Sequence, residues 1–222
     1  MRAFLCRLDT GKAGGKLTTE RRKHWHGVYS SKPPTAVSWY QEVPDRSLRL
    51  IKAAGVSLDD AIIDIGGGAS TLVDHLLEAG YGDLTVLDLT ETAFDHSRER
   101  LGERASSVNW VVSDIVHFKP QRLYRLWHDR AVLHFLTDAT DRERYVDVLR
   151  EALAPGGHAV IATFGPAGPL KCSGLEIRRY DVRMLEELLG AEFELQSHEL
   201  ANHRTPMGAT QQFLYSCWTR RG

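Results

Sequence analysis

The chain has 222 residues, of which 42% are hydrophobic and 26% are charged, as in an ordinary soluble globular protein. Its 28 basic and 29 acidic side chains give a net charge of −1, which does not favour non-specific binding to nucleic acid. No apolar run approaches the roughly 18–20 residues that would span a bilayer. The three cysteines are dispersed and predict neither a disulfide framework nor a metal site. We therefore expect a cytoplasmic protein with no nucleic acid, membrane or metal partner.

The first 56 residues predict two segments that precede the sheet. Residues 1–20 are rich in glycine and mildly basic, which predicts a flexible tail and leaves an organellar leader as the alternative. Residues 21–56 predict a helical segment rich in aromatic residues, which we call the aromatic segment and expect to cap the functional site. Within it, apolar spacing predicts a helix over residues 44–54.

From residue 57 onward, apolar runs of strand length alternate with amphipathic stretches of helical length. The expected strands cover residues 61–65, 84–87, 108–112, 123–128 and 158–164. The expected helices cover residues 70–78, 92–101 and 141–153. Strands and helices that alternate at this spacing indicate a parallel, doubly wound α/β sheet with right-handed crossovers.

The end of the chain follows a different pattern. Residues 181–189 predict a helix, and residues 193–199 and 212–219 predict two strands with no helix between them. Strands that are joined so directly must run antiparallel. We therefore expect residues 57–222 to form one domain whose parallel sheet ends in an antiparallel hairpin, whereas nicotinamide-binding Rossmann domains usually continue with helical crossovers.

A glycine-rich turn follows the first expected strand and reads Asp64-Ile65-Gly66-Gly67-Gly68. Glycines there let the backbone approach a ligand closely, and in an open α/β sheet this turn lies where ligands bind. The turn lacks the dinucleotide fingerprint, because Thr71 occupies the position of the third glycine. The acidic end of the strand also favours a ligand with a positively charged amino group over a pyrophosphate.

Aspartates also end the next two expected strands. Asp88 lies 20 residues after Gly68, where a carboxylate can accept hydrogen bonds from both hydroxyls of a ribose. Asp114 ends the third strand, where a carboxylate can bind an adenine amino group while Ile115 packs on the ring. A helix N-cap or a solvated loop is the alternative for each aspartate alone. Three acids at successive strand ends, beside the glycines, indicate a ligand that contains adenosine.

Together with Leu153-Ala154-Pro155-Gly156-Gly157, these features resemble the successive motifs of class I methyltransferases that use S-adenosylmethionine (SAM). The resemblance covers roughly residues 45–220 and implies a Rossmann-like sheet of seven strands, mostly parallel, whose last strand is antiparallel. It also implies contacts to the methionine part of SAM from Asp64, Gly66, Gly67 and Gly68, to the ribose from Asp88 and Leu89, and to the adenine from Asp114 and Ile115. These motifs bind the cofactor alone and do not identify the methyl acceptor.

The aromatic segment is the first candidate place for the acceptor. Trp25, Tyr29, Trp39 and Tyr40 are dense for a segment outside the sheet, and aromatic faces can stabilise the SAM cation and exclude water. We expect Trp25, Tyr29 and Trp39 to contact the cofactor; the alternative is that they only pin the segment to the core. The Trp-x-x-x-Tyr pattern also resembles the N-terminal segment of thiol and halide methyltransferases and of some protein-lysine methyltransferases.

The end of the fourth expected strand is the second candidate place. By the resemblance it faces the transferred methyl group, and His128 could act there as a base near neutral pH as well as contact the cofactor. Asp129 could orient an amine or thiol, and Arg130 could bind an acidic acceptor. The alternative is a structural histidine beside a local Asp129–Arg130 ion pair. The Asn-Pro-Pro-Tyr type of motif is absent, which argues against nucleobase and glutamine amide acceptors.

The loop over residues 165–180 is the third candidate place, because a loop after the fifth strand can lie over the pocket as a lid. Cys172 lies in this loop beside Lys171, and we expect it to be an ordinary surface cysteine rather than a reactive thiol. The loop over residues 203–208 could reach the rim of the same pocket.

The sequence therefore predicts a SAM-dependent methyltransferase that acts on a small-molecule nucleophile, such as a thiol or another soft acceptor. The alternative enzyme is a protein-lysine methyltransferase. The alternative that is not an enzyme is a regulatory protein that binds SAM without turnover. The intact glycines and the aromatic segment favour turnover, and the short, nearly neutral chain leaves little room for a separate protein-recognition domain.

Overall fold

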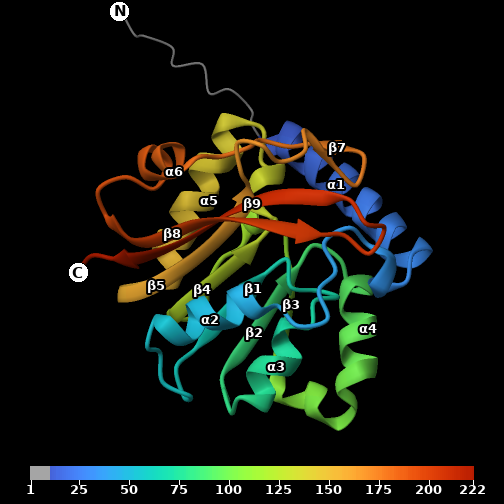
Figure 1. Ribbon diagram of the computed structural model, residues 1–222, viewed down its shortest axis with the longest axis horizontal. Helices are drawn as coiled ribbons and strands as arrows, with labels where there is room; N and C mark the ends of the chain where they lie inside the picture. Colours follow the sequence, from blue (N-terminus) through green and yellow to red (C-terminus); the bar gives the residue numbers. More distant parts are fainter. Residues whose placement is uncertain (1–10) are drawn as a thin grey trace, which may run out of the picture.

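The computed structural model describes residues 11–222 of the chain, which form a seven-stranded sheet with helices on both faces (Figure 1). The strands of this sheet are β1 (Ile62–Ile65), β2 (Leu84–Asp88), β3 (Val108–Val112), β4 (Tyr124–Arg130), β5 (Leu153–Phe164), β8 (Phe193–Arg204) and β9 (Thr210–Arg220). A separate hairpin consists of β6 (Lys171–Cys172) and β7 (Leu175–Glu176). The α-helices are α1 (Gly11–Ser31), α2 (Asp45–Ala53), α3 (Leu72–Glu78), α4 (Thr92–Leu101), α5 (Ala139–Ala152) and α6 (Val182–Leu189). Short 3-10 helices cover Pro34–Ala36, Gly102–Ser107, Ile115–His117 and Leu133–Phe135.

The strand order is β3-β2-β1-β4-β5-β9-β8. Strands β1 to β5 are parallel, and β9 runs antiparallel to both β5 and β8. This confirms the predicted doubly wound, seven-stranded sheet that ends in an antiparallel hairpin. Five strands extend beyond the expected ranges: β2 continues to Asp88, β4 continues to Arg130, β5 begins at Leu153, β8 continues to Arg204, and β9 covers Thr210–Arg220.

The side chains of β1 divide between two hydrophobic cores, one on each face of the sheet. Ile63 and Ile65 pack in the core that contains residues of α5 and α6, whereas Ile62 packs in the core that contains residues of α2, α3 and α4. Successive side chains of a strand point to opposite faces. A continuous apolar run is therefore what a strand covered on both faces requires, and this burial holds the strand ends in a fixed register.

Helix α1 begins at Gly11, within the tail predicted over residues 1–20, so the helical segment starts earlier than expected. Arg21 on this helix forms an ion pair with Asp141 on α5. Tertiary contacts of this kind stabilise helices that would be marginal alone in water, and the local sequence does not reveal them. Residues 1–10, the rest of the predicted tail, lie outside the described residues.

The loop expected over residues 165–180 contains the β6–β7 hairpin. Ser173 and Gly174 form its two-residue turn, with φ angles of 50° and 80°; positive φ at both turn residues matches the twist of the flanking strands. Lys171 and Glu176 form an ion pair across the two strands at 2.7 Å. In Figure 1 the hairpin lies next to α1.

Among the described residues, no helix has both the length and the apolar character needed to cross a membrane. Nor does any group of three or more His, Cys, Asp or Glu side chains in residues 11–222 lie close enough together to hold a metal ion. Cys172 and Cys217 are free thiols, and both are buried.

Candidate active site

A cavity of about 350 Å³ lies at the carboxyl ends of β1 to β4, bordered by α1 and the β6–β7 hairpin. Open α/β sheets bind their ligands at this position, and the volume is typical of a small-molecule site. Eight of the predicted cofactor residues line it, namely Trp25, Tyr29, Trp39, Gly66, Asp88, Leu89, Asp114 and Ile115. The other lining residues are Arg21, Ile65, Leu87, Ser113, Arg130, Ala131, Val132, Phe135, Leu136, Thr137, Cys172, Leu175 and Glu176.

A second, smaller cavity of about 40 Å³ lies beside the glycine turn and shares Trp39, Ile65, Gly66 and Arg130 with the first. Three further predicted residues line this smaller cavity, namely Asp64, Gly67 and His128. Two predicted residues, Gly68 and Asp129, line neither cavity.

The three glycines of the turn are required by close packing. Gly66 has a φ of +68°, and a Cβ atom there would collide with Val132. A Cβ at Gly67 would collide with the carboxylate of Asp64. A Cβ at Gly68 would lie 2.6 Å from the carboxylate of Asp88. The turn therefore brings its backbone against the acidic groups of the site, which no larger residue would permit.

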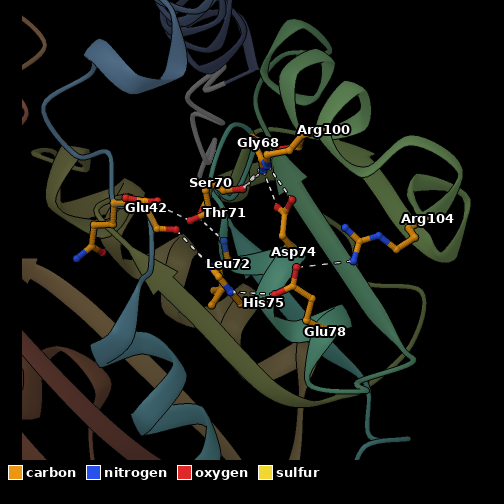
Figure 2. Close-up of polar contacts among 12 residues, drawn as sticks. Glu42, Gly68, Ser70, Thr71, Leu72, Asp74, His75, Glu78, Arg100 and Arg104 are labelled. Carbon is orange, nitrogen blue, oxygen red and sulfur yellow. Dashed lines mark hydrogen bonds and ion pairs between the residues drawn. The ribbon is translucent and has the colours of Figure 1, made fainter.

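Arg100 fixes the turn from the side of α4, as Figure 2 shows. Its Nε and Nη2 donate to the two carboxylate oxygens of Asp74 on α3, both at 2.7 Å, and Nη2 also donates to the Ser70 carbonyl at 2.8 Å. The same view shows the aromatic segment tied to α3, where His75 Nε2 lies 3.1 Å from the Glu42 carbonyl. A forked guanidinium makes strong, directional contacts, so α3, α4 and the turn form one rigid unit.

Asp88 ends β2 with its carboxylate buried. It accepts hydrogen bonds from the Leu89 amide at 2.7 Å, the Gly68 amide at 3.2 Å and the Tyr29 hydroxyl at 3.2 Å. Burial raises the pKa of Asp88 to about 6, although these hydrogen bonds oppose the shift. The carboxylate thus joins α1 to the glycine turn and presents its charge at the cavity wall.

Asp114 lies two residues after β3 and takes the role of helix N-cap, one of the alternatives from the sequence, whereas adenine binding stays a prediction. Its Oδ1 accepts the Val116 amide at 3.2 Å, which caps the short helix that follows. Its Oδ2 accepts the Thr18 hydroxyl at 2.9 Å and lies 3.8 Å from Arg21. The residue therefore caps a helix and also stands between α1 and the cavity.

Aromatic side chains form one wall of the cavity. The ring of Trp25 lies 5.7 Å from that of Trp39, 5.1 Å from that of Phe135 and 6.0 Å from that of Tyr29, measured between centroids. These separations are typical of packed aromatic pairs. The side chains thus pin α1 and the segment after it to the domain and line the cavity as well.

His128 points away from the large cavity. Its Nδ1 lies 2.6 Å from an Asp64 carboxylate oxygen, its Nε2 lies 2.8 Å from the Ser47 hydroxyl, and the ring is buried. Both ring nitrogens are therefore engaged by protein groups. The prediction that His128 acts as a base stays a prediction, and this geometry favours a role in positioning Asp64.

Asp129 is fully buried on the opposite face of β4. It accepts hydrogen bonds from the Tyr145 hydroxyl at 2.7 Å, the Val132 amide at 2.8 Å and the Leu133 amide at 3.1 Å. Burial raises its pKa to about 6. These contacts brace the turn after β4, where Ala131 has a positive φ of 77°, a conformation that non-glycine residues rarely adopt.

Several cavity residues were missed or misjudged from the sequence. Cys172 was expected at the surface, but it is buried and lines the cavity, because the β6–β7 hairpin turns it inward. Burial raises the pKa of its thiol. From the sequence, Arg130 was only a possible ligand for an acidic acceptor. Because side chains alternate along β4, it lies on the same side of the sheet as His128, and it lines both cavities. No local signal identified Arg21 or Phe135.

Residues 63–159 match a protein family described as a methyltransferase domain. The fold, the glycine turn and the acids at the strand ends agree with that match, and the chain belongs to the class I SAM-dependent methyltransferase superfamily, with SAM as its cofactor. Among its relatives, nodulation protein S of Sinorhizobium fredii is 31% identical over 173 residues, which cover 76% of each chain. EEF1A lysine methyltransferase 2 of Danio rerio is 25% identical over 173 residues, which cover 71% of this chain and 73% of the relative.

Two solved structures share the fold. N-methyltransferase NodS of Bradyrhizobium japonicum, in complex with S-adenosylhomocysteine (SAH), is similar with a TM-score of 0.63 and 20% identity, over 82% of this chain and 90% of that one. The 1,6-didemethyltoxoflavin-N1-methyltransferase of Burkholderia thailandensis, with bound 1,6-didemethyltoxoflavin and SAH, is similar with a TM-score of 0.69 and 18% identity, over 99% of this chain and 94% of that one.

Proposed function

We propose that this chain transfers the methyl group of SAM to an amine nitrogen of a small molecule. The observation that carries the proposal is the large cavity: residues of α1 and of the β6–β7 hairpin line it together with the strand ends, which favours an acceptor small enough to enter it. Nitrogen as the acceptor atom is supported by the two similar solved structures, which are N-methyltransferases by name. The proposal keeps the expected small-molecule nucleophile and replaces the thiol or other soft acceptor by an amine.

In this proposal SAM lies along the strand ends. Asp88, beside Leu89, accepts hydrogen bonds from the ribose hydroxyls, and Asp114 accepts one from the adenine amino group while Ile115 packs on the ring. Asp64 receives the α-ammonium group of the methionine part. Its Oδ2 is buried without a hydrogen-bond partner among the described residues, and a buried unsatisfied carboxylate oxygen has a free-energy cost that a bound cation removes.

The transfer itself needs alignment more than proton abstraction. The amine lone pair attacks the methyl carbon in line with the sulfonium, the carbon–sulfur bond breaks, SAH leaves, and the methylated amine releases a proton to solvent. Among the described residues, no histidine lines the large cavity. Trp25 and Trp39 supply aromatic surface that excludes water and favours the sulfonium cation.

Two other functions remain as competing candidates. Protein-lysine methylation is favoured by the similarity to EEF1A lysine methyltransferase 2, and a lysine side chain is itself an amine on a narrow stem. A SAM-binding regulator without turnover would need the same cofactor contacts and no acceptor site.

Methyl-labelled SAM tests these candidates directly. The full chain is incubated with a protein-free metabolite extract and, separately, with the protein fraction of a lysate. We expect label in the small-molecule fraction only. Label in protein alone would favour the lysine methyltransferase, and tight SAM binding with label in neither fraction would favour the regulator. Asp88→Ala serves as the matched control, because it should reduce label transfer in whichever fraction is the true one.

A further inference from the structure

Arg130 ends β4 where the two cavities meet, and it lines both of them. Its guanidinium is fixed by three neighbours. Nε donates to the Tyr215 hydroxyl at 3.1 Å, Nη1 donates to the Trp39 carbonyl at 2.9 Å, and the guanidinium carbon lies 4.9 Å from the centroid of the Phe213 ring. The orientation of the group is therefore set by the protein alone.

The remaining nitrogen, Nη2, is buried and has no hydrogen-bond partner among the described residues. None of the three carboxylates nearby pairs with Arg130: Asp129 accepts three hydrogen bonds of its own, Glu176 forms an ion pair with Lys171, and Asp64, in the smaller cavity, is held through Oδ1 by His128. The Oδ2 of Asp64 and the Nη2 of Arg130 are both buried without a hydrogen-bond partner among the described residues, so neither atom satisfies the other. A guanidinium withdrawn from water without an anion carries a desolvation cost. The site is therefore built around a positive charge that lacks its counter-ion.

We propose that Arg130 binds an oxyanion of the ligand, and that the methyl acceptor is a small molecule that carries a carboxylate or phosphate group. This inference rests on the proposed function, because it gives the chemistry of the same small acceptor. A fixed guanidinium with a free N–H donor suits these groups, since charge-assisted hydrogen bonds to carboxylate and phosphate are the strong ones.

The place of Arg130 in the sheet favours the acceptor as the source of the oxyanion. Asp88 at the end of β2 and Asp114 just after β3, which receive the adenosine part in the proposed function, lie on one side of β1, whereas β4 lies on the other side. Cys172 and Leu175 of the hairpin also line the large cavity. The carboxylate in the methionine part of SAM has the same chemistry, so the experiment must separate the two sources.

The first arm uses two cofactor analogues. SAH carries the methionine carboxylate, and 5′-deoxy-5′-methylthioadenosine lacks the whole amino acid part. Both are titrated calorimetrically into the full chain, Arg130→Gln and Arg130→Lys. We expect each analogue to bind the variants within about threefold of the parent chain. A loss of roughly 10- to 100-fold for SAH alone would assign the oxyanion to the cofactor and overturn the inference about the acceptor.

Arg122→Gln is the matched control for this arm. Arg122 precedes the same strand at its opposite end and pairs with Asp83 at the surface. The variant should leave the affinity for both analogues unchanged, and its thermal unfolding gives the reference for the two Arg130 variants.

The second arm uses the unmodified chain and so does not depend on how a variant folds. Small molecules of a metabolite extract are separated on an anion exchanger at a pH of about 11, above the usual pKa of an amine, so that a carboxylate or phosphate on an amine gives a net negative charge. The anionic pool and the neutral or cationic pool are then returned to neutral pH, and each is incubated with methyl-labelled SAM. We expect label in the anionic pool. Label in the neutral or cationic pool alone would overturn the inference and keep the proposed function. Label in neither pool, together with label in the protein fraction of a lysate, would overturn the proposed function.

The labelled pool then supplies the substrate for a kinetic comparison. Arg130→Gln should raise KM for the anionic acceptor by roughly 10- to 100-fold, with a much smaller change in kcat, and Arg130→Lys should restore part of the loss by returning the charge. An unchanged KM in Arg130→Gln would refute the assignment of Arg130.

Discussion

At the scale of single residues, the Asp88 carboxylate joins separate segments of the fold and lines the cavity in which we propose that SAM binds. The Leu89 and Gly68 amides and the Tyr29 hydroxyl all donate to it, and these donors aim it at the cavity. Burial raises its pKa to about 6 because the charged form loses hydration. The affinity and the pH dependence of cofactor binding should both follow from this one side chain.

Asp88→Ala should weaken SAM binding by roughly 10- to 100-fold. The ribose hydroxyls would lose their charged acceptor, which is worth about 1.5–3 kcal/mol, while the strand itself should survive because the residue lies at its end. Calorimetric titration measures the effect, with circular dichroism as the control for folding. An unchanged dissociation constant in a folded variant would show that the ribose binds elsewhere.

SAM affinity should fall in acid. The ribose needs the ionised form of Asp88, whose pKa in the folded chain is raised to about 6. Above that pH the carboxylate is charged and affinity is constant; below it, protonation competes with binding, so that the dissociation constant at pH 5 should be about tenfold higher than at pH 7.5. Asp88→Asn should bind more weakly and lose this dependence. A parent chain with a flat profile between these values would contradict the prediction.

We expect His128 to position Asp64 in the proposed SAM site rather than to remove a proton from the methyl acceptor. Replacing His128 by Asn breaks its buried hydrogen bonds to Asp64 and Ser47. We expect a loss of about 1–3 kcal/mol in the free energy of unfolding and weaker SAM binding, with kcat at saturating SAM within tenfold of the parent. Ser47→Ala should reproduce part of the stability loss. A fall of about 10²–10⁴ in kcat, with a flattened pH profile in the His128 variant only, would restore the role of His128 as a base.

At the scale of elements, α1 closes the site by contacts to residues that are distant in sequence. Tyr29 donates a hydrogen bond to Asp88 on β2, Thr18 donates one to Asp114 after β3, and Trp25 packs on Phe135 after β4. These contacts stabilise the helix, and the helix in turn forms part of the cavity wall.

The α3–α4 unit behind the glycine turn depends on Arg100. Arg100→Ala would leave the largely buried Asp74 without its forked partner, which should cost about 1–3 kcal/mol of stability. Arg104→Ala is the matched control on the neighbouring turn; Arg104 is half exposed and lies 3.9 Å from the equally exposed Glu78, so its loss should stay within about 0.5 kcal/mol. Urea unfolding measures both. Equal effects from the two variants would show that the Arg100–Asp74 pair does not brace the turn.

At the scale of the whole molecule, ligand binding should stabilise the fold selectively. SAH at about 100 times its dissociation constant should add roughly 2.7 kcal/mol, which raises Tm by about 5–10 °C for a chain of this size. NAD at the same concentration should leave Tm unchanged, because Asp64 repels a pyrophosphate and Thr71 replaces the third glycine of the dinucleotide turn. A comparable shift with NAD would contradict the glycine argument.

Local sequence patterns predict the sheet and much of the wall of the large cavity. An apolar run such as residues 61–65 is typical of a strand that is buried on both faces, and the carboxyl ends of parallel strands meet at one edge, so residues at or just after these ends, such as Asp88 and Asp114, come together. For these residues, position along the chain implies position in space. The predicted antiparallel end of the sheet followed in the same way from a connection too short for a crossover.

Which side of the sheet each residue of the fourth strand faces depends on tertiary contacts that the local sequence does not show. β4 continues to Arg130, so that His128 lies within the strand against Ser47 and Asp64, and Asp129 points into the opposite core. The hairpin buries Cys172, and α1 begins in the predicted tail. Each of these outcomes depends on contacts between segments far apart in the chain, and local spacing carries no information about which partner a side chain will meet.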